Sequence, residues 1–210
     1  MVFLPSRLGR TEKFFKMIGS RIGHRLDPYL DYVLKRVLGQ RGNPDLFTFL
    51  GLLATLVASF FVLRESWGMA GLAIILSGIF DLFDGAVARN RDRVTTFGGF
   101  FDSVSDRYSD LLLLLAFLVH YLRKGDSDLV ILTALVSIGT ALVPYTKARA
   151  EAIQVPCNIG LMERAERIIL LTAGTLFGWM RPILWILAIL THFTALQRIY
   201  YVWKKLKNEG

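Results

Sequence analysis

Uncharged, apolar runs recur along the chain and alternate with short charged segments. Two runs, 46–63 and 129–146, are each 18 residues long, close to the length of helix that crosses the hydrocarbon core of a bilayer. Four shorter runs are bounded by charged residues: 66–80, 111–122, 168–180 and 182–197. Six closely spaced apolar runs are atypical of a soluble protein. The pattern therefore predicts an all-α integral membrane protein.

The four shorter runs become full spans only if charged residues at their ends enter the membrane. Charged side chains at that depth are costly, and they commonly serve a function. We therefore expect the chemistry to lie at the charged ends of the helices. The predicted transmembrane helices cover residues near 46–64, 67–90, 95–122, 128–153, 162–180 and 182–204.

The segment before the first span has a different pattern. Four apolar residues recur at every fourth position among basic ones: Phe14, Ile18, Ile22 and Leu26. This spacing predicts an amphipathic helix on the membrane surface over residues 11–40, interrupted at Asp27-Pro28. The chain then divides into a cytoplasmic amphipathic juxtamembrane segment, residues 1–42, and a six-helix membrane domain, residues 43–210.

The charge distribution supports a membrane location and an orientation. The chain has 25 Lys and Arg against 17 Asp and Glu, a net charge of +8, and 53% of its residues are hydrophobic. In such an apolar chain a basic surplus favours anionic lipid over nucleic acid as the partner. Counting Lys and Arg in the loops places both termini, and the charged helix ends, on the cytoplasmic side of the cytoplasmic membrane. The single cysteine, Cys157, lies in a polar loop and is expected to be inert.

Carboxylates cluster between the second and third predicted spans. Asp81 and Asp84 are three residues apart on one helical face, and Asp102 and Asp106 are four apart on the next helix. The polar, basic segment between the two helices predicts a turn, so the two acidic faces can meet. Like charges in a partly dry site need protonation or a cation, and oxygen ligands favour Mg²⁺, then Mn²⁺ or Ca²⁺. The alternative is a set of solvated carboxylates that bind no metal.

The full motif adds small and basic residues at fixed distances. It reads Asp81-x-x-Asp84-Gly85-x-x-Ala88-Arg89, eight residues, then Gly98-x-x-x-Asp102-x-x-x-Asp106. This pattern resembles the signature of the CDP-alcohol phosphatidyltransferase family. The resemblance implies two bound Mg²⁺ or Mn²⁺ ions, with Asp81, Asp84 and Asp102 as metal ligands. It implies that Asp106 is the catalytic base and also touches metal, and that the protein is a homodimer.

The resemblance also implies a reaction and a donor site. An acceptor hydroxyl attacks the lipid-side phosphorus of CDP-diacylglycerol, or of an ether lipid such as CDP-archaeol, and CMP leaves. The expected CDP-binding residues include a Pro-Asp-x-x-Thr element at the start of the first span: Asp45, Thr48, Asp81, Gly85, Ala88 and Arg89. The structural alternatives are an N-terminal cap for Asp45 and an ordinary helix-start residue for Thr48.

A second charged cluster indicates the alcohol acceptor. Four basic residues lie at the cytoplasmic ends of the fourth and fifth spans: Lys147, Arg149, Arg164 and Arg167. They suit an anion pocket, because arginine binds phosphate through two hydrogen bonds. The region resembles that of phosphatidylinositol-phosphate and archaetidylinositol-phosphate synthases, which implies inositol 1-phosphate as the polar acceptor.

Three alternatives remain open. The basic cluster could serve only to anchor the helix ends at the membrane surface. The acceptor could be glycerol 3-phosphate, which would make the protein a phosphatidylglycerophosphate synthase. A non-enzymatic Mg²⁺ transporter is the alternative of another class, although its charges should be spread across the bilayer, whereas these carboxylates gather at one end.

Overall fold

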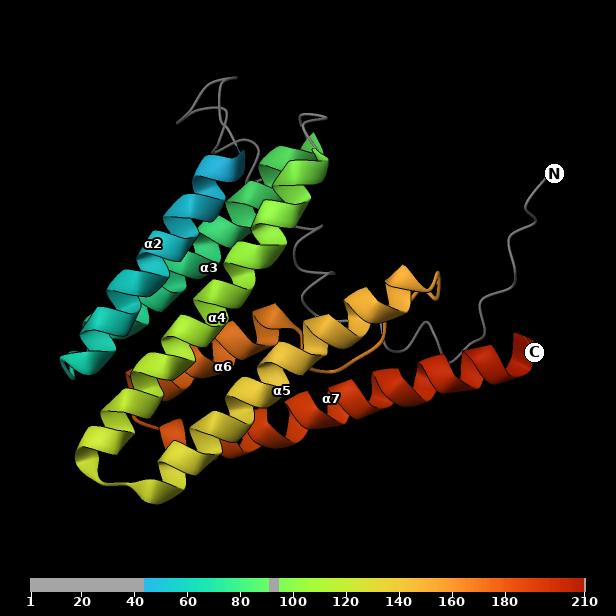
Figure 1. Cartoon of the computed structure of the whole chain (residues 1–210). Coiled ribbons are helices and arrows are strands. Elements are labelled where there is room, and N and C mark those ends of the chain that lie inside the picture. Colours follow the sequence, from blue (N-terminus) through green and yellow to red (C-terminus); the bar gives the residue numbers. More distant parts are fainter. Residues whose placement is uncertain (1–43, 91–94, 210) are drawn as a thin grey trace.

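The computed structural model describes residues 44–90 and 95–209, and this part of the chain forms six α-helices (Figure 1). They are α2 (Pro44–Leu63), α3 (Trp67–Asn90), α4 (Thr96–Lys124), α5 (Ser127–Ala152), α6 (Arg164–Phe177) and α7 (Met180–Glu209). The prediction of an all-α membrane fold is confirmed, and each predicted span coincides with one helix. Helix α6 is shorter than predicted at both ends, and α7 is longer. The juxtamembrane segment 1–42, with its predicted surface helix at 11–40, lies outside the described residues.

The turn between α4 and α5 illustrates how local sequence sets the helix ends. Gly125 ends α4 in the left-handed conformation, with φ 73°, which glycine adopts at no steric cost. Asp126 immediately caps α5, since its carboxylate accepts a hydrogen bond from the Leu129 N–H at 3.1 Å. With so few residues between them, α4 and α5 must run antiparallel. At its other end α4 is capped by the Thr95 side chain, which accepts from the Gly98 N–H at 2.9 Å.

Four of the described helices are long and apolar enough to cross a membrane: α2, α3, α5 and α7. The chain is accordingly an integral membrane protein. Helix α4 is long but carries several charged residues, and α6 has only 14 residues, about 21 Å at 1.5 Å per residue. Helix α4 carries Asp102 and Asp106 of the predicted site, and α6 carries Arg164 and Arg167.

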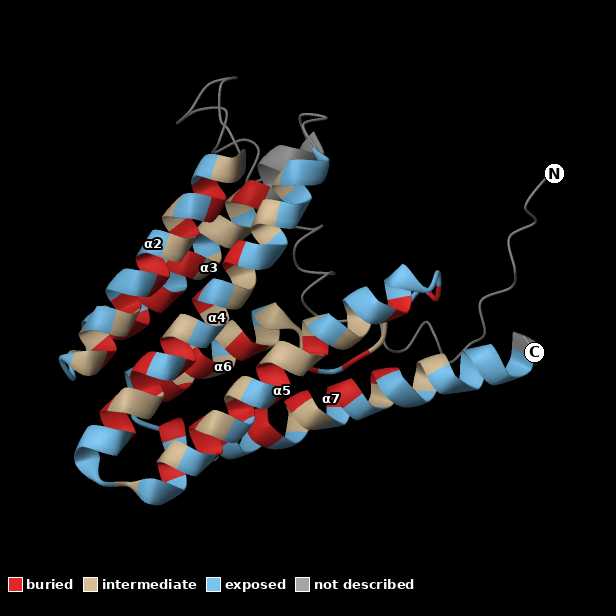
Figure 2. Cartoon of the chain, viewed as in Figure 1, coloured by how far each residue is buried: buried red, intermediate tan, exposed pale blue. Residues whose placement is uncertain are grey.

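The helices form two groups of three. Helix α2 packs against α3 and α4, and α7 packs against α5 and α6, while α4–α5 and α3–α6 contacts join the two groups. In Figure 1 the two groups diverge from the α4–α5 turn. The buried face of each helix points inward, and large apolar side chains cover much of the outside, as a lipid-facing surface requires (Figure 2).

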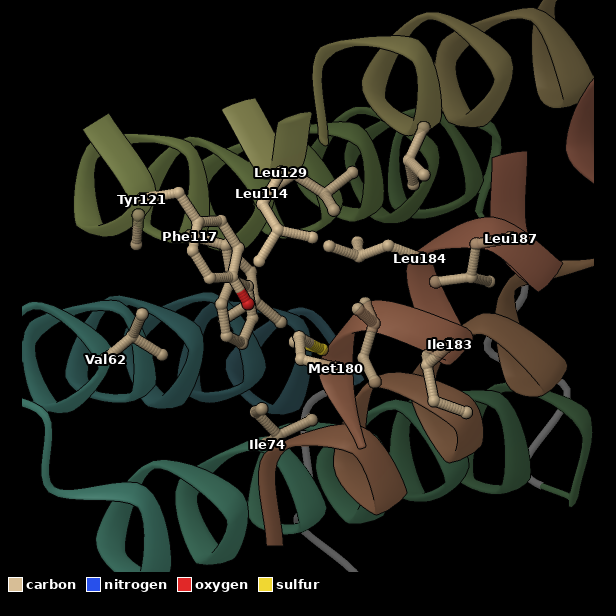
Figure 3. Close-up of a cluster of buried hydrophobic side chains, with 14 of the residues drawn as sticks. Val62, Ile74, Leu114, Phe117, Tyr121, Leu129, Met180, Ile183, Leu184 and Leu187 are labelled. Carbon is tan, nitrogen blue, oxygen red and sulfur yellow. The ribbon is translucent and has the colours of Figure 1, made fainter. Parts of the chain in front are cut away.

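The hydrophobic core lies at the end of the bundle opposite the aspartates. Phe117 and Leu114 of α4 meet Leu184 of α7 there, beside Val62 at the end of α2 (Figure 3). Close helix contacts add to this packing. Gly139 of α5 faces α7 so closely that a Cβ at this position would lie 2.9 Å from the Cβ of Thr191. The apolar packing between the two groups is thus concentrated at this end.

At the other end, α3 and α4 stay apart. Both pack on α2, but within the described residues their backbones do not pack against each other. The space between them is where the two acidic faces meet.

Candidate functional site

Three of the four predicted aspartates converge. Asp81 of α3 and Asp102 and Asp106 of α4 each place one carboxylate oxygen within 4.8 Å of the other two. The Oδ1 atom of Asp102 is buried and has no hydrogen-bond partner in the described structure, although buried polar atoms are nearly always satisfied. An oxygen-only cluster with an unsatisfied acceptor fits a hard divalent cation such as Mg²⁺ or Mn²⁺.

The fourth aspartate, Asp84, lies next to this cluster rather than within it. It is 7% exposed and accepts a hydrogen bond from the Thr48 hydroxyl of α2 at 3.0 Å. Together with Asp81 and Asp106 it lines a small polar cavity of about 10 Å³. Its polar lining also includes Thr48, Arg164 and three serines: Ser77, Ser105 and Ser109.

A hydrogen-bond network below the aspartates holds α2 against α3. The Ser77 hydroxyl donates to the Gly51 carbonyl at 3.0 Å and lies 2.8 Å from the Thr55 hydroxyl, which also bonds Gly51 at 3.1 Å. Ser77, Asp81 and Asp84 share one face of α3, because they are four and seven residues apart. The network therefore fixes the face that carries the carboxylates. The aspartate motif alone did not predict this network. The sequence signal for it was Ser77, a hydroxyl residue one helical turn before Asp81.

Two predicted acceptor residues contact the acidic residues directly. Arg164 forms ion pairs through Nη1 with Asp81 and Asp106, and Arg167 forms one with Asp110. Arg164 is the first residue of α6, and a capping box holds that helix end: the Glu163 N–H donates to the Glu166 carboxylate at 3.2 Å. The cationic and acidic clusters thus form one continuous charged site.

A cationic pocket of about 170 Å³ opens beside Asp106, between α4, α5, α6 and α7. Three of the four predicted basic residues line it: Lys147, Arg164 and Arg167. Arg149 is exposed and is not among the lining residues. Two further arginines, Arg107 and Arg198, also line the pocket, and the motif-based prediction missed them. The signals were present, since Arg107 directly follows Asp106 and Arg198 ends an apolar run.

Arg198 also holds the pocket together. Its side chain is 1% exposed, and its Nε donates to the Ile159 carbonyl at 2.7 Å. Its two Nη atoms contact the Val143 carbonyl and, at 3.3 Å, the Glu163 carboxylate. Arg198 therefore links α7 to α5 and to the loop that precedes α6.

An apolar groove of about 400 Å³ lies on the other side of the aspartates, between α3 and α6. Asp81 and Glu166 stand at its charged end. Its walls are mostly aliphatic and aromatic, and several wall residues face outward toward the lipid: Ile79, Leu82, Ile169 and Phe177. Such a groove suits a lipid chain.

The predicted CDP-binding residues are described only in part. Asp45 lies at the start of α2, where its Oδ1 would be 3.2 Å from a Cβ on Gly98, so a side chain at position 98 would crowd it. Thr48 reaches Asp84, as described above. Gly85, Ala88 and Arg89 belong to the last turns of α3, but their side chains lie outside the described part of the structure.

The sequence profile of the CDP-alcohol phosphatidyltransferases matches residues 42–197. The chain belongs to this family. It is 39% identical over 170 residues to archaetidylinositol phosphate synthase of Methanothermobacter thermautotrophicus, covering 78% of this chain and 84% of that one. It is 35% identical over 172 residues to phosphatidylinositol phosphate synthase of Mycobacteroides abscessus, covering 76% and 77%.

The fold has a solved counterpart. The crystal structure of Mycobacterium tuberculosis phosphatidylinositol phosphate synthase with CDP-DAG bound superposes with a TM-score of 0.72 at 28% identity, covering 87% of this chain and 94% of that one. A second structure of the same protein is a complex with manganese and citrate, with a TM-score of 0.71 and 28% identity. It covers 84% of this chain and 88% of that one.

These findings confirm the predicted family. The chain is therefore a membrane-embedded transferase of phospholipid biosynthesis. The aspartate cluster is suited to a divalent cation, and the donor class is a CDP-linked lipid. Membership of this enzyme family rules out the alternative of a non-enzymatic Mg²⁺ transporter. The roles of individual residues stay predictions.

Proposed function

We propose that the protein transfers the lipid phosphoryl group of a CDP-activated lipid to inositol 1-phosphate and releases CMP. The observation that carries this proposal is the cationic pocket beside Asp106, lined by one lysine and four arginines. An acceptor that already bears a phosphate dianion would use that charge, whereas a neutral or zwitterionic alcohol would not.

The donor lipid is proposed to enter from the bilayer. The apolar groove between α3 and α6 ends at Asp81, so a lipid chain in the groove leads its phosphate toward the aspartates. The nucleotide would then lie toward Asp45, Thr48 and the end of α3, where Gly85, Ala88 and Arg89 belong to the motif. CDP-diacylglycerol and CDP-archaeol differ in whether ester or ether bonds join their chains to glycerol, and the apolar groove suits the chains of either donor.

Asp81, Asp84, Asp102 and Asp106 are proposed to hold two divalent ions, Mg²⁺ or Mn²⁺. When bound, such ions neutralise the pyrophosphate and the charge that develops on the leaving CMP. Asp106 lies at the boundary between the metal cluster and the cationic pocket, because it lines both cavities. It is thus placed to take the proton from an acceptor hydroxyl as that hydroxyl attacks.

The acceptor phosphate is proposed to bind Lys147, Arg164 and Arg167, together with the newly found Arg107 and Arg198. Arg149 is the weakest member of the predicted set, because it does not line the pocket. Similarity to synthases named for inositol phosphates favours inositol 1-phosphate over glycerol 3-phosphate.

We further propose that the site and both termini face the cytoplasm and that the enzyme works as a homodimer. The excess of Lys and Arg in segments at the site end supports this orientation. The family resemblance supports the dimer.

CMP release by the purified enzyme tests the proposed function. CDP-diacylglycerol or CDP-archaeol is supplied with Mg²⁺ and one acceptor from a panel of inositol 1-phosphate, inositol, glycerol 3-phosphate and serine. We expect inositol 1-phosphate to give the highest kcat/KM. Asp106→Asn should lower kcat by roughly 10²–10⁴-fold, the range for loss of a general base. Arg167→Gln should chiefly raise the acceptor KM.

Arg181→Gln is the matched control. Arg181 lies at the opposite end of the bundle, paired with Asp126 at 2.9 Å, and should leave the kinetics unchanged. Equal rates with free inositol and inositol 1-phosphate would contradict the phosphate-binding role of the pocket. Preference for glycerol 3-phosphate would reassign the acceptor and leave the reaction class intact.

A further inference from the structure

Arg164 lies between the two polar cavities of the site and lines both of them. Its side chain lines the cationic pocket of about 170 Å³, and it also lines the polar cavity of about 10 Å³ with Asp81, Asp84 and Asp106. Within the described residues no other arginine or lysine lines both spaces. One side chain therefore belongs to the proposed metal site and to the proposed acceptor site.

The carboxylates hold Arg164 on the metal side. Its Nη1 pairs with Oδ1 of Asp81 and Oδ1 of Asp106, two of the three aspartates whose oxygens converge. Its Nε lies 3.8 Å from Asp110 and has no hydrogen-bond partner in the described structure. The guanidinium is thus fixed at one end only. Among the described residues, its remaining donors have no second partner of comparable strength.

The helix itself does not favour a cation at this position. Arg164 is the first residue of α6, where the helix dipole presents its positive end. The carboxylates are therefore the principal attraction that keeps the guanidinium there. The backbone, in contrast, is held by the capping box of Glu163 and Glu166. A change of side-chain rotamer would reorient the guanidinium without moving the helix.

A guanidinium and a divalent cation need the same oxygens. Both are attracted to Asp81 and Asp106, they repel each other, and the doubly charged ion is attracted more strongly at equal distance. We infer that Arg164 couples the two sites. It leaves Asp81 and Asp106 when a divalent cation binds there, and it then donates to the acceptor phosphate in the adjacent pocket. This inference rests on the proposed function of both sites.

The coupling has a consequence for the order of binding. Before the cation binds, the acceptor pocket lacks the charge of Arg164, because two carboxylates neutralise it. After the cation binds, the pocket gains one free guanidinium. The acceptor is therefore expected to bind well only to the metal-loaded enzyme. Since coupling between two ligands is reciprocal, phosphate should also tighten metal binding.

Arg167 provides an internal contrast. It lines the same pocket, but its carboxylate partner is Asp110, which is not part of the converging cluster. Arg167 should contribute to phosphate binding without competing for the metal. Comparing variants of Arg164 and Arg167 therefore distinguishes competition with the metal ion from attraction of phosphate alone.

The test measures Mn²⁺ binding to the full-length purified protein by electron paramagnetic resonance of the free ion, with and without a saturating concentration of inorganic phosphate. For the wild type we expect phosphate to tighten Mn²⁺ binding by about 5–150-fold, the usual range of coupling between sites. Arg164→Gln should bind Mn²⁺ alone more tightly than the wild type. In this variant phosphate should have a clearly smaller effect, limited to direct contact between phosphate and Mn²⁺. Arg167→Gln should bind Mn²⁺ as the wild type does and keep the coupling.

The outcomes are distinguishable. Unchanged or weaker Mn²⁺ binding in Arg164→Gln overturns the inference while leaving the proposed function standing. Undetectable Mn²⁺ binding by the wild type overturns the metal site and this inference together. Arg164→Met, which also removes the charge, provides the same comparison if the glutamine variant does not fold. It should likewise bind Mn²⁺ more tightly than the wild type, and unchanged or weaker binding would overturn the inference.

Discussion

Arg198 allows a quantitative test of how the cationic pocket is built. We consider the substitution Arg198→Met, which keeps an extended side chain of moderate volume but removes the charge and all donors. The native side chain is 1% exposed and bonds Ile159, Val143 and Glu163. Its loss would leave a loop carbonyl without its donor and a carboxylate without its cation.

The free-energy cost of losing each of these contacts has a known range. A buried group left without its hydrogen-bond partner costs about 1–3 kcal/mol, and removal of one partner of a buried ion pair costs about 3–5 kcal/mol in total. The lower part of this range is expected, since Glu163 is only partly buried. At about 2–4 °C per kcal/mol for a chain of this size, 3 kcal/mol corresponds to a fall in melting temperature of about 6–12 °C.

The assay is thermal unfolding of the detergent-purified protein, followed by circular dichroism. Arg181→Gln is again the comparison, because that arginine is also ion-paired but half exposed, so its pair should contribute at most about 1 kcal/mol. If Arg198→Met melts at the same temperature as Arg181→Gln, the contacts of Arg198 do not hold the pocket. Its position would then reflect ligand binding alone.

Three further outcomes follow from single contacts. Thr48→Val should weaken Mn²⁺ binding by about 10–100-fold, because Asp84 loses the hydrogen bond that orients it; a Mn²⁺ titration measures this. Gly139→Ala should lower the free energy of unfolding by about 1–3 kcal/mol through overpacking against Thr191, seen as a lower melting temperature. Burial raises the pKa of the Cys157 thiol, so maleimide labelling at neutral pH should be slow until the protein is denatured; rapid labelling of the folded protein would contradict this.

The helices and the acidic motif were predictable from sequence for a simple reason. In a membrane each span must satisfy its own backbone hydrogen bonds, so long apolar runs specify helices locally. Charged residues that interrupt such runs are then conspicuous, and Asp81, Asp102 and Asp106 could be recognised by helical spacing alone. The mismatch at α6 is small. The span was predicted from residue 162, and the helix starts at Arg164 because the capping box of Glu163 and Glu166 begins it there.

The partners of the site residues were less predictable. Arg107 and Arg198 line the cationic pocket, yet Arg198 is distant in sequence from every other lining residue and belongs to no recognised motif. Arg149 seemed equivalent to Lys147 by proximity, but two residues along a helix turn the side chain to a nearly opposite face. The Thr48 contact with Asp84 also required the packing of α2 against α3.

The sequence by itself determined the membrane class, the six helices and the family, since these depend on local hydrophobicity and on spacing along single helices. Only the tertiary structure decided which charges meet. It brought Arg164 to Asp81 and Asp106, gave Arg167 a different partner in Asp110, and set Asp84 beside the cluster rather than in it. The physical reason is that ion pairs and hydrogen bonds form only between groups a few ångströms apart, and the chain places these groups on separate helices.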